Sequence, residues 1–137
     1  MLRTSLDVVL RLRDDAERRA LTALGAATQA FQAAHEKLEE ARAEVDRDAP
    51  QHSGACGAWL VAISDHADQA ALAKVRDAEQ RVTEATRSQD AARGSHLDAR
   101  AAQRVIARVV DAKREAHRRE LDRREQSALD ELAILRA

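Results

Sequence analysis

Hydrophobic residues recur at helical spacing along two stretches of the chain, 1–137, and one stretch of helix-breaking residues separates them. The only proline and two of the four glycines fall within residues 48–57. Proline and glycine interrupt helices, whereas the flanking stretches keep a three- and four-residue periodicity. We therefore predict one domain with a helix over about 3–47, a loop over about 48–57 and a second helix over about 58–135.

The first stretch carries a continuous heptad repeat. Large residues alternate with alanine along most of the repeat, which allows two helices to approach closely, although Arg13 and Glu17 interrupt it. Its predicted seam consists of Arg3, Leu6, Leu10, Arg13, Glu17, Ala20, Leu24, Ala27, Phe31, Ala34, Leu38, Ala41 and Val45.

The second stretch carries a similar row with one irregular spacing, between Ala67 and Val75. Three polar residues, Gln89, His96 and Gln103, lie on the same row. Its apolar members are Leu60, Ile63, Ala67, Ala71, Val75, Ala78, Val82, Ala85, Ala92, Ala99, Ile106 and Val110, followed by Leu121, Ala128, Leu132 and Leu135.

Two such rows joined by a short loop predict an all-α, long antiparallel two-helix coiled-coil hairpin whose C-terminal helix is the longer. If Val45 packs near Leu60, Leu6 packs near Ala99, and residues from about 103 onward have no partner within the chain. Glycine weakens a helix interior, so Gly94 offers a place for the second helix to bend.

Composition and charge exclude several classes. Charged residues make up 34% and aromatic residues 1% of the chain, so there is little material for a compact core. A net charge of −1 gives no general attraction to nucleic acid or to anionic membranes. Arg11 and Arg13 break the apolar stretch that a signal peptide needs, and the single cysteine fits a reducing compartment. We therefore expect a cytoplasmic protein without direct membrane insertion.

No catalytic constellation is present in the sequence. His52 and Cys56 lie four apart in the loop, with Asp48, Asp65 and His66 nearby, but a metal site needs three or four convergent ligands. We favour a solvated loop tip, and we expect no metal, no cofactor, no catalytic residues and no enzyme activity.

Basic residues gather in the second stretch. Between Arg100 and Arg124 there are nine basic and four acidic residues, and Arg100, Arg104 and Arg108 recur every four residues. Without aromatic residues to stack on bases, such a row favours an acidic protein surface over nucleic acid as its partner. A solvated arginine face remains the alternative.

The two ends of the chain carry recognisable phrases. Residues 6–27, LDVVLRLRDDAERRALTALGAA, open with Leu-x-x-Val-Leu-x-Leu-Arg and an acidic residue a turn later. Residues 124–131, REQSALDE, are similar to Arg-x-Glu-Gln-Lys-x-Leu-Asp-Glu, with Ser127 where lysine is common and the arginine one place closer. These phrases resemble the opening and closing motifs of the flagellar export protein FliJ family.

The resemblance implies a non-enzymatic coiled-coil stalk of the flagellar type III export apparatus, which resembles the central stalk of rotary ATP synthases. Its expected partners are the export ATPase hexamer, the cytoplasmic domain of the export gate and, for some members, export chaperones. Such a protein would be cytoplasmic and peripherally associated with the inner-membrane apparatus. The alternatives are the equivalent stalk of a virulence injectisome, a structural coiled coil that dimerises through helix two, and a lipid-binding amphipathic helix.

Two sets of residues follow as candidate partner contacts. Phe31 and Trp59 are the only aromatics that could meet the export gate, although Trp59 would equally close the end of the seam. The candidate ATPase contacts are Arg104, Arg108, Arg119, Arg124, Glu125, Gln126, Leu129 and Asp130.

Overall fold

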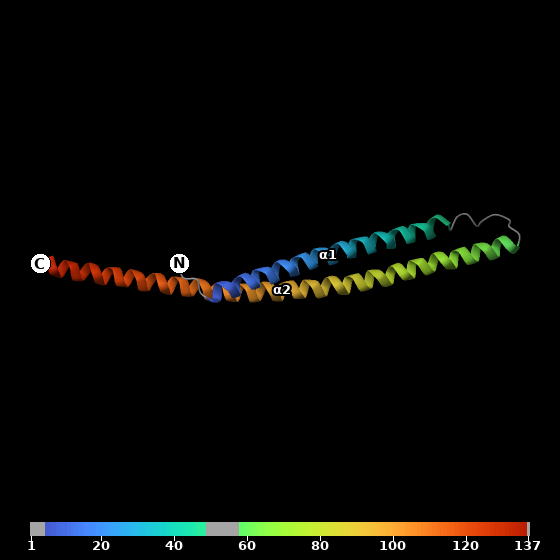
Figure 1. The fold of residues 1–137 in the computed structure, drawn as a ribbon. Coiled ribbons are helices and arrows are strands. Elements are labelled where there is room, and N and C mark those ends of the chain that lie inside the picture. Colours follow the sequence, from blue (N-terminus) through green and yellow to red (C-terminus); the bar gives the residue numbers. More distant parts are fainter. Residues whose placement is uncertain (1–4, 49–57, 137) are drawn as a thin grey trace. The chain divides into compact units, whose positions relative to one another are not determined.

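Two α-helices account for the described part of the chain: α1 over Ser5–Asp48 and α2 over Ala58–Arg136 (Figure 1). The computed structural model describes residues 5–48 and 58–136, and the side chains of 5–47 and 65–136. These residues form two compact units. Unit 1 combines Met1–Ala20 with His96–Ala137, and unit 2 is Leu21–Ser95.

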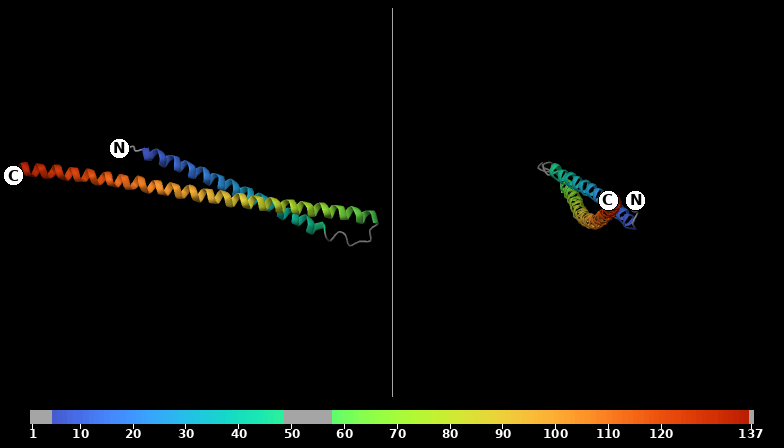
Figure 2. Two further views of the ribbon diagram at one scale, coloured as in Figure 1. Left: turned by 90° about the horizontal axis from the view of Figure 1, so that it is seen from below. Right: turned by 90° about the vertical axis from the view of Figure 1, so that its left-hand side faces the viewer.

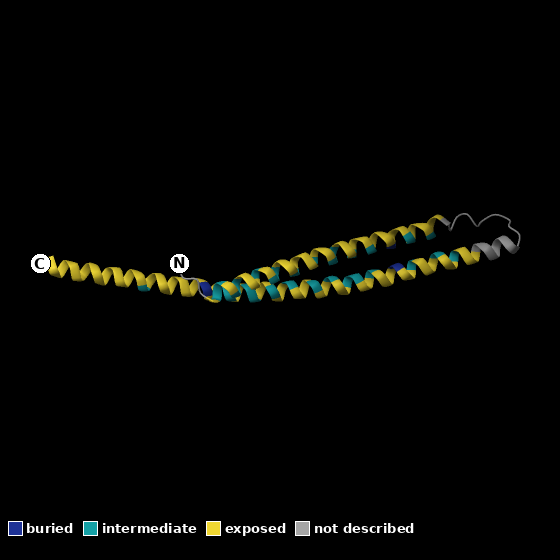
Figure 3. Cartoon of the chain, viewed as in Figure 1, coloured by how far each residue is buried: buried dark blue, intermediate teal, exposed yellow. Residues whose placement is uncertain are grey.

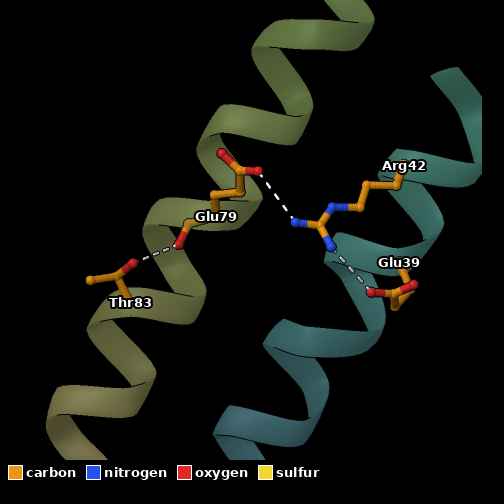
Figure 4. Close-up of polar contacts among 4 residues, drawn as sticks. All are labelled: Glu39, Arg42, Glu79 and Thr83. Carbon is orange, nitrogen blue, oxygen red and sulfur yellow. Dashed lines mark hydrogen bonds and ion pairs between the residues drawn. The ribbon is translucent and has the colours of Figure 1, made fainter.

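Within unit 2 the two helices run side by side in opposite directions, which Figures 1 and 2 show from three sides. Arg42 Nη2 lies 3.4 Å from Glu79 Oε1, and Lys74 Nζ lies 3.4 Å from Glu44 Oε2. The same Arg42 reaches Glu39 Oε1 at 3.5 Å (Figure 4). These surface ion pairs contribute little free energy each, about 0–1 kcal/mol. They do show which residues of α1 and α2 lie opposite each other.

Unit 1 has the same antiparallel pairing. Gln103 Nε2 donates to Asp14 Oδ1 at 3.0 Å, and Arg114 Nη2 donates to Asp7 Oδ1 at 3.0 Å. The prediction of an all-α fold built from two antiparallel helices, the second one longer, is confirmed in each unit.

The cores of the two units lie along the predicted seams. Val110 is 2% exposed in unit 1, and Leu38 and Ala78 are 5% and 8% exposed in unit 2. Most other seam residues are half-buried, as expected where only one neighbouring helix covers them. Arg3, Leu60 and Ile63 were also predicted for the seam, but their side chains lie outside the described residues.

Two predicted seam positions are wrong. Arg13 is exposed, and the half-buried position belongs to Asp14, whose short side chain accepts the hydrogen bond from Gln103. Ala67 is also exposed, and Asp68 takes the half-buried position in that turn. The row in α2 therefore runs through Asp68, Ala71, Val75 and Ala78 at regular three- and four-residue spacing, so the irregularity predicted between Ala67 and Val75 is not found there.

The predicted pairing register is wrong by about two heptads. Glu44 lies beside Lys74 rather than near residue 61, and Asp7 lies beside Arg114 rather than near Ala99. A shift by whole heptads keeps every seam residue in the seam, so apolar spacing alone cannot select among such registers. The unpaired end of α2 consequently begins after Arg114, later than the predicted 103.

Gly94 lies inside α2, which continues through it. A Cβ atom added to Gly94 would meet nothing within 4 Å, so packing does not require a glycine there. We expect Gly94→Ala to raise the free energy of unfolding by about 1 kcal/mol, the helix-propensity difference between the two residues. Chemical denaturation followed by circular dichroism measures it, and Gly25→Ala, equally open, is the matched second site. A destabilised Gly94→Ala variant would show that the glycine has a structural role.

Candidate partner-binding segment

The end of α2, residues 115–136, is the most exposed part of unit 1 (Figure 3). Every residue in it is exposed except the half-buried Glu120. Of the described α1 only Ser5 and Leu6 precede Asp7, which pairs with Arg114, so α1 reaches at most the first residues of this stretch. We call residues 115–136 the free segment.

Ion pairs between successive turns support the helix of the free segment. Glu115 Oε1 lies 3.2 Å from Arg119 Nε, and Glu120 Oε1 lies 3.1 Å from Arg124 Nε. Gln126 Nε2 donates to Asp130 Oδ1 at 3.2 Å. Each such pair contributes about 0.2–0.5 kcal/mol to an isolated helix, so the segment stays helical without a neighbour.

The free segment also presents large apolar side chains to solvent. Leu121 is 44% exposed, and exposure rises to 82% at Leu135. Leu129, Leu132 and Ile134 are exposed as well. These exposed apolar side chains make the free segment the candidate surface for contact with another protein.

The eight predicted ATPase contacts do not share one face. Six of them lie in the free segment, while Arg104 and Arg108 lie in the paired part of unit 1, where both are exposed. Arg119 and Arg124 are separated by about 140° around the helix at 100° per residue. Within the described part of the chain, Arg104 and Arg108 form no ion pair, so both guanidinium groups are available.

Of the two predicted gate contacts, Phe31 and Trp59, the structure describes only the side chain of Phe31. Phe31 is half-buried in the seam of unit 2, with its ring centroid 6.1 Å from that of His35. It lies 17 residues before the end of α1, about 25 Å along the helix axis. Trp59 lies in α2, but its side chain is outside the described residues, as are His52 and Cys56 of the weighed metal site.

Sequence reasoning did not single out a second exposed apolar set in unit 1. Val8 and Leu12 on α1 are exposed, as are Val105 and Val109 on α2. The two residues of each pair are four apart and lie on one face of their helix, away from the seam. This spacing in the sequence could have identified the exposed set.

Unit 2 contains a groove of about 410 Å³ between its helices. Three basic and three acidic side chains line it, together with three alanines, so its charges balance and no single ligand charge is favoured. The lining residues are Ala34, Lys37, Glu40, Ala41, Glu44, Lys74, Asp77, Ala78 and Arg81. Among the described residues there is no group of three metal-binding side chains.

The class of protein follows from this geometry. Two antiparallel helices, one of which extends past the other, present long surfaces and an exposed helix end, as expected of α-helical proteins that act by binding other proteins. The family model described as flagellar FliJ protein matches residues 2–137, nearly the whole chain. The chain therefore belongs to the FliJ family, as its terminal motifs indicated.

Family membership gives this chain a part in the flagellar protein export apparatus. The family consists of structural export components and is not a known enzyme family. Neither the curated proteins nor the solved structures compared with the chain give a significant match. In the described residues, neither helix has a stretch apolar and long enough to cross a membrane.

Proposed function

We propose that this chain is a non-enzymatic stalk of the flagellar export apparatus that binds the export ATPase ring through the free segment. The observation that carries the proposal is the exposed, self-supported helix of residues 115–136 in a chain of the FliJ family. A helix that holds its own shape loses little conformational entropy on entering a ring, which favours binding.

Charge supports the same role for the neighbouring part of unit 1. Arg104 and Arg108 are exposed, and the region from Arg100 to Arg124 has five more basic than acidic residues. Acidic residues lining a ring would attract such a surface and orient the helix as it enters.

The proposed contact with the export gate involves the opposite end of α2. Contact with the cytoplasmic domain of the export gate would use Trp59, since Phe31 is half-buried in the seam. Chaperones of export substrates are a further proposed partner. Binding to the gate would hold the protein peripherally at the inner membrane, while it otherwise stays cytoplasmic. The flagellar description of the matching family favours this system over the equivalent injectisome stalk.

Charge reversal tests the arginine contacts. We expect the variant Arg104→Glu, Arg108→Glu, Arg119→Glu, Arg124→Glu to bind the export ATPase at least about tenfold more weakly, a loss of about 1.4 kcal/mol or more. Titration calorimetry with the purified ATPase measures the affinity. Stimulation of ATP turnover by the added protein should fall in parallel.

A matched control carries four charge reversals on exposed arginines of α2 in unit 2, namely Arg76→Glu, Arg81→Glu, Arg87→Glu and Arg93→Glu. It changes the net charge equally and should leave ATPase binding within about threefold of the wild type. Circular dichroism confirms that both variants stay helical. Equal weakening by the two variants would mean that binding depends on net charge and not on these four arginines. If the wild-type protein does not bind the ATPase, the proposed function is wrong.

A further inference from the structure

The apolar row of α2 continues on the same side of the helix past the point where the pairing with α1 ends. Up to Val110 the seam follows the heptad that packs against α1. Beyond it, Leu121, Ala128, Leu132 and Leu135 lie within about 40° of Val110 around the helix axis, at 100° per residue. The free segment therefore carries the continuation of the seam, which no described part of α1 covers.

Charge divides this end of α2 into two halves of opposite sign. Within the free segment, residues 115–124 contain four basic and three acidic side chains, with histidine taken as neutral. Residues 125–136 contain three acidic side chains and one basic. The net charges of the two halves are thus +1 and −2, and the sign changes between Arg124 and Glu125.

We propose that the free segment pairs with the free segment of a second copy of this chain, in antiparallel orientation. Antiparallel pairing places each basic half opposite the acidic half of the other copy, whereas parallel pairing places basic on basic. The same surface serves both copies, so the pairing closes as a two-fold symmetric dimer.

The charge boundary also sets the register of this pairing. If the two-fold axis passes between Arg124 and Glu125, Arg124 lies level with Glu125 of the second copy. In the same register Leu121 lies level with Ala128 of the second copy, a large residue opposite a small one. The alternation of large and small residues in the seam of α1 follows the same rule.

The expected dimer is weak. The interface is short and its outermost leucines lie at the helix end, so we expect a dissociation constant on the order of 10–100 μM. The dimer has a consequence that rests on the proposed function. The seam that meets the second copy is also the surface that binds the ATPase, so dimerisation and ATPase binding would exclude each other.

Sedimentation equilibrium of the full chain at 1–300 μM, with Cys56→Ser to prevent disulfides, tests the pairing. We expect a monomer–dimer equilibrium that Leu121→Glu with Leu132→Glu weakens at least thirtyfold. Val105→Glu with Val109→Glu, an exposed apolar pair outside the free segment, is the matched control and should leave the equilibrium unchanged. A wild-type chain that stays monomeric at 300 μM, or a control that weakens association equally, overturns the proposal.

A charge swap tests the orientation. One variant carries Arg118→Glu, Arg119→Glu and Arg124→Glu, and the other Glu125→Lys, Asp130→Lys and Glu131→Lys. Each alone should be monomeric, because both of its halves then have one sign, and the mixture should dimerise. Self-association of either variant as tight as wild type would overturn the charge argument.

Cysteine pairing separates antiparallel from parallel association. In the Cys56→Ser background, a Leu121→Cys copy should form a disulfide with an Ala128→Cys copy faster than with itself. Faster formation of the Leu121→Cys homodimer would indicate parallel pairing and overturn the proposal. None of these measurements involves the ATPase, so their failure leaves the stalk function untouched, and loss of ATPase binding leaves the dimer untouched.

Discussion

Replacing Val110 by alanine should loosen the pairing of α1 with α2 in unit 1. Val110 is the most buried side chain of that unit, at 2% exposure, and it lies one turn before the Arg114–Asp7 ion pair. Removing two buried methyl groups costs about 2 kcal/mol once the cavity is included. Exposed ion pairs of about 0–1 kcal/mol cannot offset such a loss.

Amide hydrogen exchange measures this effect locally. A loss of about 2 kcal/mol corresponds to roughly thirtyfold faster exchange, which we expect for the α1 residues 5–20. Val109→Ala is the control, because it makes the same chemical change with the same gain in helix propensity at an exposed neighbour. If both substitutions accelerate exchange equally, Val110 is not the residue that holds this end of α1.

The seam could be predicted from sequence because burial follows the periodicity of a helix. Leu24, Phe31 and Leu38 occupy one heptad position, and all three are half-buried or buried. The prediction failed at Arg13 because periodicity ignores hydrogen bonding. Asp14, one residue later, accepts a hydrogen bond from Gln103 across the pair and is half-buried, whereas Arg13 is exposed.

The register could not be predicted from apolar spacing, because a repeat is compatible with any shift by whole heptads. The polar residues on the seam distinguish the registers. Gln89 Nε2 donates to Thr28 Oγ1 at 3.3 Å in unit 2, and Gln103 pairs with Asp14 in unit 1. In a shifted register these half-buried amides would lose the partners named above, and the cost of each loss is below the about 1–3 kcal/mol of a fully buried unsatisfied amide.

The sequence predicted where along α2 the candidate site lies, but not which side of the helix it uses. Counting unpaired residues placed the free end in α2, although the register error moved its start from about 103 to 115. Arg119 and Arg124 were both predicted to contact the ATPase, yet each pairs with a glutamate one turn earlier, Glu115 and Glu120, on a different side of the helix. Which side meets a partner depends on that partner's shape, and this chain's sequence does not contain that information.

Leu38→Ala should lower the stability of unit 2 more than any exposed leucine substitution in it. Leu38 is 5% exposed and lies one turn before Arg42, which pairs with Glu79 of α2. Truncation of a buried leucine costs about 2–5 kcal/mol, and two helices can partly close the cavity, so we expect about 2–3 kcal/mol.

Leu72→Ala provides the comparison, because Leu72 is 47% exposed in the same unit. It removes the same atoms with the same small gain in helix propensity, and should change the free energy of unfolding by less than about 0.5 kcal/mol. Urea unfolding followed by circular dichroism measures both variants. Equal losses would mean that exposure in the folded state does not determine the loss in free energy of unfolding. The two leucines would then affect stability through the unfolded chain or through association. The concentration dependence of the unfolding midpoint separates those two causes, since only association makes the midpoint rise with protein concentration.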